Sequence, residues 1–344
     1  MFKAEEKILK WVENHMLLFC LVAATLCSLV IRCSMWEYFI DEENLVVSYV
    51  QGCKIISMIF DYMLAGVVGY WVYDWKGRQN CYLGVLAYAC VIFYPVVIMN
   101  SAAWGQCGAV AAFLVVASLL AFSKEKHVIA FVMYGIALAL QVQVLFVLPF
   151  FLFAYFVKKK FTFLYYGILL LAYGATSVLY TVLGVPGELT TYFAQLERES
   201  RLYDNYPSFW ALLSTGEDTA FLYLKVFALA FAVVVLGGIL IYWLVKKVQL
   251  TAKNMLYMAF LVAYTCALFL PGVQDSYSYC YEILAIIIVF LNRRTLPGLL
   301  LLCGISFSTY GSRLYYSPMN MPVLVLLNLV AYVSFFYTLN REMT

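Results

Sequence analysis

Charged side chains are scarce in this sequence of 344 residues. They make up 12% of the chain, whereas hydrophobic residues make up 65%. A soluble domain is about a quarter charged and about half apolar, so the composition excludes an ordinary soluble protein. The apolar runs are long and continuous, which predicts membrane-spanning helices. A β-barrel would instead show short strands of alternating hydrophobicity.

Several signatures of other protein classes are also missing. No stretch is typical of a nucleic-acid-binding surface, and no Gly-rich phosphate loop is present. The amphipathic opening segment 1–15 has no cleavage site after it, so we expect no cleavable signal peptide. The 10 cysteines have neither metal-ligand spacing nor a disulfide framework. No internal repeat is seen, so an inverted-repeat transporter has no direct support.

A helix needs about 20 apolar residues to cross a bilayer. The sequence predicts an all-α, polytopic helical membrane protein with about 12 spans (10–13), forming a single transmembrane domain over residues 1–344. The expected spans are residues 15–35, 52–74, 81–98, 107–122, 127–140, 142–157, 161–184, 219–245, 254–271, 280–291, 296–311 and 321–339.

The basic residues predict the orientation of the chain. If both termini are cytoplasmic, most of the 22 Lys and Arg residues lie on the cytoplasmic side. The ones on the outer side, or at outer span ends, are Arg32, Lys54, Arg198, Arg201, Lys225 and Arg313. This bias follows the positive-inside rule. The outer face then receives four polar segments, at 37–43, 100–106, 185–218 and 274–279. Their convergence indicates a site, although outer loops are also polar simply because they are wet.

The most informative polar segment is N-S-A-A-W-G-Q, between two hydrophobic runs. It contains Asn100, Ser101, Trp104 and Gln106. Such a break at membrane depth must be buried in protein or line a wet cavity. It resembles the Asn-Ser-Ala-x-Trp-Gly-Gln segment of bacterial membrane glycosyltransferases of the GT-C superfamily, the lipid-linked-sugar-dependent, mannosyltransferase-like proteins.

The resemblance implies a catalytic carboxylate about ten residues after an Arg that ends the first span. Here Arg32 ends the span, and the acids arrive as Asp41 and Glu42. Glu42 is the first choice for a general base and Asp41 the second, taking the proton from an acceptor hydroxyl. The long outer loop that follows in the family is short here. The alternative is a solvated acidic loop with Arg32 snorkelling to the interface.

A second resemblance lies at Gln141, Gln143 and Pro149, where the family has Lys-x-Gln-x-x-x-x-x-Pro. Its Lys is Gln141 here, and the Asp that follows its Trp-Gly-Gln segment is Gly108. An uncompensated intramembrane Lys is costly, so the absence of both the Lys and the Asp is physically consistent.

The loop 185–218 predicts an interfacial amphipathic helix followed by an Asn-x-Pro turn. Its positions that resemble the family are Tyr192, Gln195, Leu202, Asn205, Pro207 and Trp210.

The segment L-P-G-V-Q-D-S-Y resembles the family's Leu-Pro-x-Met-His-Glu-Arg-Tyr, with Tyr277 kept. Gln274, Asp275 and Ser276 replace the His, Glu and Arg that are expected to face a lipid phosphate. A guanidinium is the natural bidentate ligand of phosphate, and Arg313 or Arg32 could supply it.

The resemblance therefore implies a hexosyltransferase of the bacterial cytoplasmic membrane. It would transfer a sugar from a polyprenyl-phosphate donor to an extracytoplasmic glycan or cell-surface acceptor. The expected substrate-binding residues are Arg32, Asn100, Trp104, Gln106, Gln141, Gln143, Asn205, Gln274, Tyr277 and Arg313.

No cofactor or metal ligand is assigned, and metal dependence stays open. The expected partners are membrane lipid, the donor, the acceptor and a candidate membrane protein, with no nucleic acid. Two alternatives stay open. One is a catalytically degenerate accessory or lipid-glycan-binding subunit, and the other is a transporter of a lipid-linked glycan.

A cysteine placed at position 342 should react with a membrane-impermeant maleimide only when the cytoplasmic face is accessible, because the basic residues put that end of the chain inside. A cysteine at position 198 serves as the outer control. Labelling of position 342 only from outside contradicts the orientation.

Overall fold

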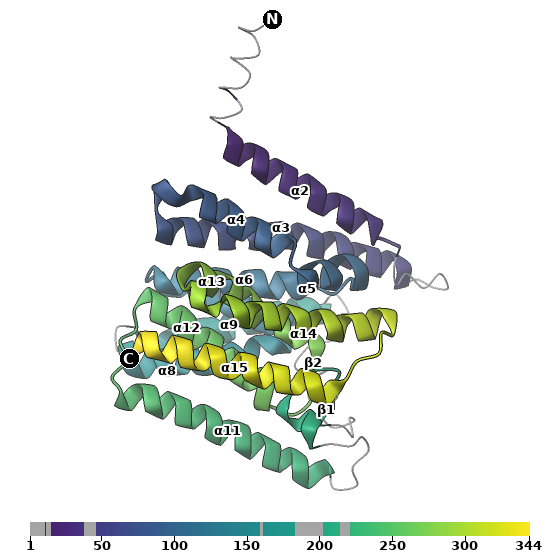
Figure 1. Ribbon diagram of the computed structural model, residues 1–344. Helices are drawn as coiled ribbons and strands as arrows, with labels where there is room; N and C mark the ends of the chain where they lie inside the picture. Colours follow the sequence, from purple (N-terminus) through teal and green to yellow (C-terminus); the bar gives the residue numbers. More distant parts are fainter. Residues whose placement is uncertain (1–10, 12–14, 38–45, 159–160, 183–201, 214–220) are drawn as a thin grey trace, which may run out of the picture. The chain divides into compact units, whose positions relative to one another are not determined.

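The computed structural model describes the chain except residues 1–10, 12–14, 38–45, 159–160, 183–201 and 214–220 (Figure 1). The described residues are mostly helical, which confirms the all-α prediction. The chain divides into two compact units, Met1–Ala109 and Val110–Thr344.

The helices are apolar enough to form a membrane protein. In the described part of the chain, six helices are long and apolar enough to cross a membrane, or seven if the bent pair Cys81–Ile92 and Pro95–Trp104 is one span. The helices α6, α7 and the run Val142–Val157 are apolar but shorter. The membrane class is therefore supported, and a count of twelve spans stays a prediction.

The first unit is a small group of helices. Its elements are α2 (Met16–Ser34), α3 (Val46–Lys76), η1 (Arg78–Asn80), α4 (Cys81–Ile92), α5 (Pro95–Ile98) and η2 (Met99–Trp104).

The close pairing of α3 and α4 depends on two glycines. A Cβ atom on Gly69 would lie 2.8 Å from the backbone oxygen of Gly84, and one on Gly84 would lie 2.9 Å from the oxygen of Gly69. Small residues let helix backbones approach where no hydrophobic effect drives helices together in lipid.

The second unit contains the remaining elements. They are α6 (Gly108–Ser123), α7 (His127–Leu140), η3 (Val142–Val147), α8 (Leu148–Lys158), α9 (Leu164–Val182), β1 (Tyr203–Asp204), η4 (Phe209–Leu212), α11 (Phe221–Val245), α12 (Ala252–Phe269), β2 (Val273–Gln274), η5 (Asp275–Ser278), α13 (Tyr279–Leu291), η6 (Arg293–Thr295), α14 (Leu296–Tyr315) and α15 (Met321–Met343). Helix α6 begins at the boundary of the two units.

Helix α12 is the central helix of the second unit. Its residues from Asn254 to Phe269 are all buried, and it packs against α11, α13 and α15. Its polar groups find partners within the unit. The Tyr264 hydroxyl donates to Asn328 Oδ1 at 2.6 Å, and the Thr265 and Tyr332 hydroxyls lie 2.8 Å apart.

A two-residue parallel strand pair positions the polar segments of this unit. Tyr203 pairs with Val273, and Asp204 pairs with Gln274; the two strands lie side by side in Figure 1. The Gly272 amide extends the pairing by donating to the Leu202 carbonyl at 2.9 Å. The Asn-x-Pro segment and the L-P-G-V-Q-D-S-Y segment are thereby joined.

Gly69→Ala should destabilise the protein, because a methyl group at the α3–α4 crossing must push the two backbones apart. Overpacking of this kind costs about 1–3 kcal/mol. Gly66→Ala is the matched control in the same helix, since a Cβ atom there meets nothing within 4 Å. Thermal unfolding in detergent measures the difference, and equal melting temperatures for the two variants contradict the crossing.

Candidate functional site

The N-S-A-A-W-G-Q segment is a buried break in a helical hairpin of the first unit. Pro95 begins α5 after α4 has ended at Ile92, and the two helical pieces are bent by 52°. The chain then widens into the π-helical turn η2, which Gly105 ends with a φ of 77°. Such π-helical turns are frequent at functional sites.

Polar groups of this segment bond to one another. The Asn100 side-chain amide donates to Gln106 Oε1 at 2.9 Å, and the Gln106 backbone amide donates to the Asn100 carbonyl at 2.9 Å. Asn100 is buried, while Trp104 and Gln106 are half-buried.

One face of α3 meets this segment with polar side chains. Lys54, Ser57 and Asp61 are spaced by three and four residues, so they lie on the same side of the helix. The Ser57 hydroxyl donates to the Gln106 carbonyl at 2.6 Å, and Lys54 Nζ donates to the Trp36 carbonyl at 2.8 Å. All three side chains are buried.

Asp61 forms a buried ion pair with Arg32. Arg32 Nη2 and Nε lie 3.1 and 3.2 Å from Asp61 Oδ2, and both side chains are 0% exposed. The Ser101 hydroxyl also donates to Asp61. Arg32 Nη1 bonds to the Ile92 carbonyl at 3.0 Å and to the Ser28 hydroxyl. Arg32 therefore does not snorkel to an interface. It links α2, α3, the end of α4 and the polar segment.

Gly108 explains why the carboxylate expected from the resemblance is missing. A Cβ atom at this position would lie 2.7 Å from Asn100 Oδ1. A side chain here has to displace the Asn100 amide, which is otherwise bonded to Gln106. Glycine at 108 and the closed amide pair therefore belong together.

The second unit holds another polar centre, which we call the Arg313 ledge: Asp204, Asn205, Gln274, Asp275 and Arg313. Arg313 Nε donates to Asp275 Oδ2 at 3.0 Å, and its Nη2 donates to Asp204 Oδ1 at 2.8 Å. The Asn205 amide bonds to Asp275 Oδ2 at 2.8 Å. Asn205 has a φ of 53°, a left-handed conformation that asparagine tolerates better than most residues.

The ledge is only partly closed. Asp275 is 1% exposed, whereas the side chains of Arg313 and Asp204 are 32% and 33% exposed. Burial raises the pKa of the Asp275 carboxyl above its ordinary value, and Arg313 and Asn205 beside it oppose that rise. The partly exposed side chains are those of Arg313, which donates hydrogen bonds, and Asp204, which accepts them, so together they suit a ligand that carries hydroxyl groups.

The segment that contains Gln141 and Gln143, which we call the glutamine segment, contacts the L-P-G-V-Q-D-S-Y segment of the ledge. Gln143 donates to Gln141 Oε1 at 2.6 Å in η3. Further along η3, the Phe146 ring meets the Tyr277 ring edge to face, with centroids 5.8 Å apart. Tyr277 follows Asp275 in η5, so this contact connects the two segments that resemble the family.

The structure therefore brings the predicted residues together in two sets. Arg32, Asn100, Trp104 and Gln106 belong to the first unit. Gln141, Gln143, Asn205, Gln274, Tyr277 and Arg313 belong to the second. A single cavity lined by both sets stays a prediction. Asp41 and Glu42 lie outside the described residues, as does most of the loop 185–218, so the catalytic assignment and the interfacial helix also stay predictions.

Three carboxylates were missed from the sequence, two in these centres and Glu282 outside them. Asp61 and Glu282 are acids within apolar helices, and an intramembrane carboxylate is by itself a signal for a buried partner. Glu282 is 0% exposed and accepts a hydrogen bond from Ser306. Asp204 stands directly before Asn205, where nothing in the sequence indicates its pairing with Arg313.

No group of three His, Cys, Asp or Glu side chains that could hold a metal ion occurs among the described residues. Comparison with protein-family models and with curated proteins finds no match for this chain. The fold and these centres define a polytopic helical membrane protein with two internal polar centres, one closed and one partly open.

Asp61→Asn or Arg32→Gln should destabilise the protein strongly, because each leaves the other charge buried without its partner. Breaking a buried ion pair costs about 3–5 kcal/mol. The double variant Arg32→Met, Asp61→Leu should lose less stability than either single variant, since it leaves no buried charge.

Thermal unfolding in detergent tests this order. The control is Glu37→Gln, which removes an exposed carboxylate. If the double variant is as unstable as the sum of the single variants, the ion pair is not what couples these residues.

Proposed function

We propose that this protein is an integral-membrane glycosyltransferase that uses a polyprenyl-phosphate sugar. The observation that carries the proposal is the assembly of the second unit's three family-like segments. The Asn-x-Pro segment contacts the L-P-G-V-Q-D-S-Y segment through the β1–β2 pair and the Asn205–Asp275 bond. The segment that holds Gln141 and Gln143 contacts it through Phe146 and Tyr277.

Arg313 is the stronger candidate for the donor phosphate. The family carries its Arg within the segment where this chain has Ser276, and Arg313 bonds to the neighbouring Asp275. Its side chain is one-third exposed, whereas Arg32 is fully buried. Asp275 and Asp204 hold the guanidinium in place through its Nε and Nη2 atoms.

The chemistry is a displacement at the anomeric carbon. The acceptor oxygen bonds to that carbon, the bond from carbon to phosphate oxygen breaks, and polyprenyl phosphate leaves. Glu42, or Asp41 in its place, takes the acceptor's proton. Positioning of the two substrates and stabilisation of the leaving phosphate supply the rest of the rate enhancement.

The proposed setting is the bacterial cytoplasmic membrane, with about twelve spans and both termini in the cytoplasm. Sugar and acceptor then meet at the outer face, where the polar segments are expected. The transferred group is a hexose, and the acceptor is an extracytoplasmic glycan or another cell-surface polymer.

One observation favours a second candidate, an accessory subunit that binds a lipid-linked glycan without transferring it. In the first unit, Arg32 is neutralised by Asp61, and the Asn100 amide occupies the space over Gly108. The charges that the family keeps in this region are replaced by internal hydrogen bonds. Binding through the Arg313 ledge does not need them.

The double variant Asp41→Asn, Glu42→Gln should lose turnover while still binding the donor, because loss of a general base costs on the order of 10²–10⁴-fold in rate. Glu37→Gln is the matched control near the same loop. The assay measures transfer from a polyprenyl-phosphate hexose by purified protein, and donor binding is followed separately by native mass spectrometry.

Two outcomes change the proposal. Full activity of the double variant places the base elsewhere. Binding of the donor by the wild-type protein, without transfer to any acceptor glycan, replaces the transferase with the accessory subunit.

A further inference from the structure

A two-part groove lies at the C-terminal end of α15, within the second unit and away from the Arg313 ledge. The smaller part, of about 210 Å³, is lined by Arg294, Tyr337, Thr338, Arg341 and Glu342. The larger part, of about 490 Å³, runs toward α11. Tyr337 and Arg341 line both parts, so the two are adjacent on α15.

The smaller part is suited to an anion. It holds two guanidiniums, and neither Arg294 nor Arg341 forms an ion pair with any described residue. The carboxylate that lines it, Glu342, is already engaged by Lys253 Nζ at 2.6 Å and by the Tyr257 hydroxyl at 3.0 Å. Two arginines facing one small pocket match the oxygens of a phosphate group.

The larger part is suited to an apolar chain. Its walls include the aromatic rings of Tyr242, Tyr332, Phe336 and Tyr337. Val333 also lines it and is 62% exposed, so the groove opens along the apolar flank of α15. A basic pocket next to an aromatic groove suits a ligand that has an anionic head and an apolar tail.

A buried amide donor belongs to a residue of the larger part. Asn340 precedes Arg341, lines the larger part and is 7% exposed. Its Oδ1 accepts from Trp243 Nε1 at 2.7 Å, but its Nδ2 has no partner among the described residues. A buried amide donor without an acceptor costs free energy, and this one lies in a residue that lines the larger part.

We propose that this groove is a binding site for an anionic phospholipid. The phosphate lies between Arg294 and Arg341, and an acyl chain follows the aromatic walls. Basic pockets between membrane helices bind anionic headgroups in this way. The site is independent of the proposed transfer reaction.

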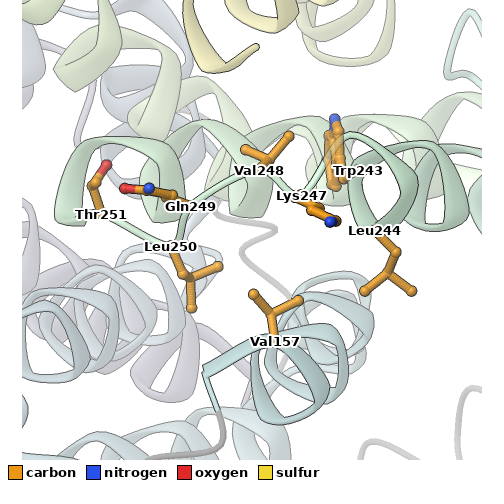
Figure 2. A pocket seen from close by; sticks show the side chains of 8 residues that line it. All are labelled: Val157, Trp243, Leu244, Lys247, Val248, Gln249, Leu250 and Thr251. Carbon is orange, nitrogen blue, oxygen red and sulfur yellow. The ribbon is translucent and has the colours of Figure 1, made fainter.

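A neighbouring pocket provides the comparison. It measures about 510 Å³ and is lined by residues that include Val157, Trp243 and Lys247 (Figure 2). Figure 2 shows Val157 on one side and Lys247 on the other. Among the described residues that line this pocket, Lys247 is the one cation. Arg293 is exposed and lines neither part of the groove. Neutralising Lys247 and Arg293 therefore removes as much positive charge as neutralising Arg294 and Arg341, but outside the groove.

The test uses the full-length protein in neutral detergent micelles, titrated separately with phosphatidylglycerol and phosphatidylcholine and followed by native mass spectrometry. Phosphatidylglycerol should bind preferentially. The double variant Arg294→Gln, Arg341→Gln should weaken its binding by roughly 25-fold, since each basic residue near a lipid headgroup contributes about a fivefold change. The control double variant Arg293→Gln, Lys247→Gln should bind like the wild type.

Three results would overturn the proposal: equal binding of the two lipids, wild-type binding by the groove variant, or an equal loss in the control variant. Glycerol phosphate is the last probe, because it carries the headgroup phosphate without acyl chains. It should compete poorly, and competition as strong as that of phosphatidylglycerol would show a free-phosphate site in place of a lipid site.

Discussion

The structure depends on one constraint, that polar groups within an apolar helical bundle must find their partners inside the protein. Water is absent from the bilayer core, and an unsatisfied polar group there costs several kcal/mol. The Arg32–Asp61 pair meets this constraint in the first unit. Asp275 with Arg313, and Glu282 with Ser306, meet it in the second. Each pair joins separate helical segments, so the same contacts that satisfy charges also fix the fold.

The two polar centres satisfy the constraint to different degrees. In the first unit, both partners of the ion pair are fully buried, and the Asn100 amide closes on Gln106. In the second unit, Asp275 is buried but Arg313 and Asp204 keep a third of their surface exposed. The first centre is enclosed, whereas the side chains of Arg313 and Asp204, although paired with each other, can still be reached from outside. The difference favours a structural role for the first centre and ligand binding for the second.

Composition and apolar run length were enough to predict the helical membrane class, because both depend on residues averaged over long windows. The polar break at Asn100 was also predictable, since four polar or aromatic residues interrupt an apolar run. The Arg32–Asp61 pair was not. Asp61 lies 29 residues from its partner. The helical spacing of Lys54, Ser57 and Asp61 places these residues on one face of α3, but spacing alone does not show that this face is buried or that Arg32 lies against it. The two-residue strands β1 and β2 are too short to give any alternating pattern.

Three positions that are charged in the family that the sequence resembles are uncharged here, and the structure shows which groups lie beside each of them. Gly108 has no carboxylate, and the Asn100 side chain occupies the space above it. Gln141 has no ammonium, and it accepts a hydrogen bond from Gln143. Ser276 has no guanidinium, and Arg313, from a different helix, bonds to Asp275 beside it. Compared with the family that the sequence resembles, the first two positions have neutral hydrogen bonds nearby in place of charge, whereas beside the third a cation comes from a different helix. Because a fold does not carry its activity with it, the proposal of a phosphate-bearing ligand depends on the contacts of Arg313 more than on the resemblance.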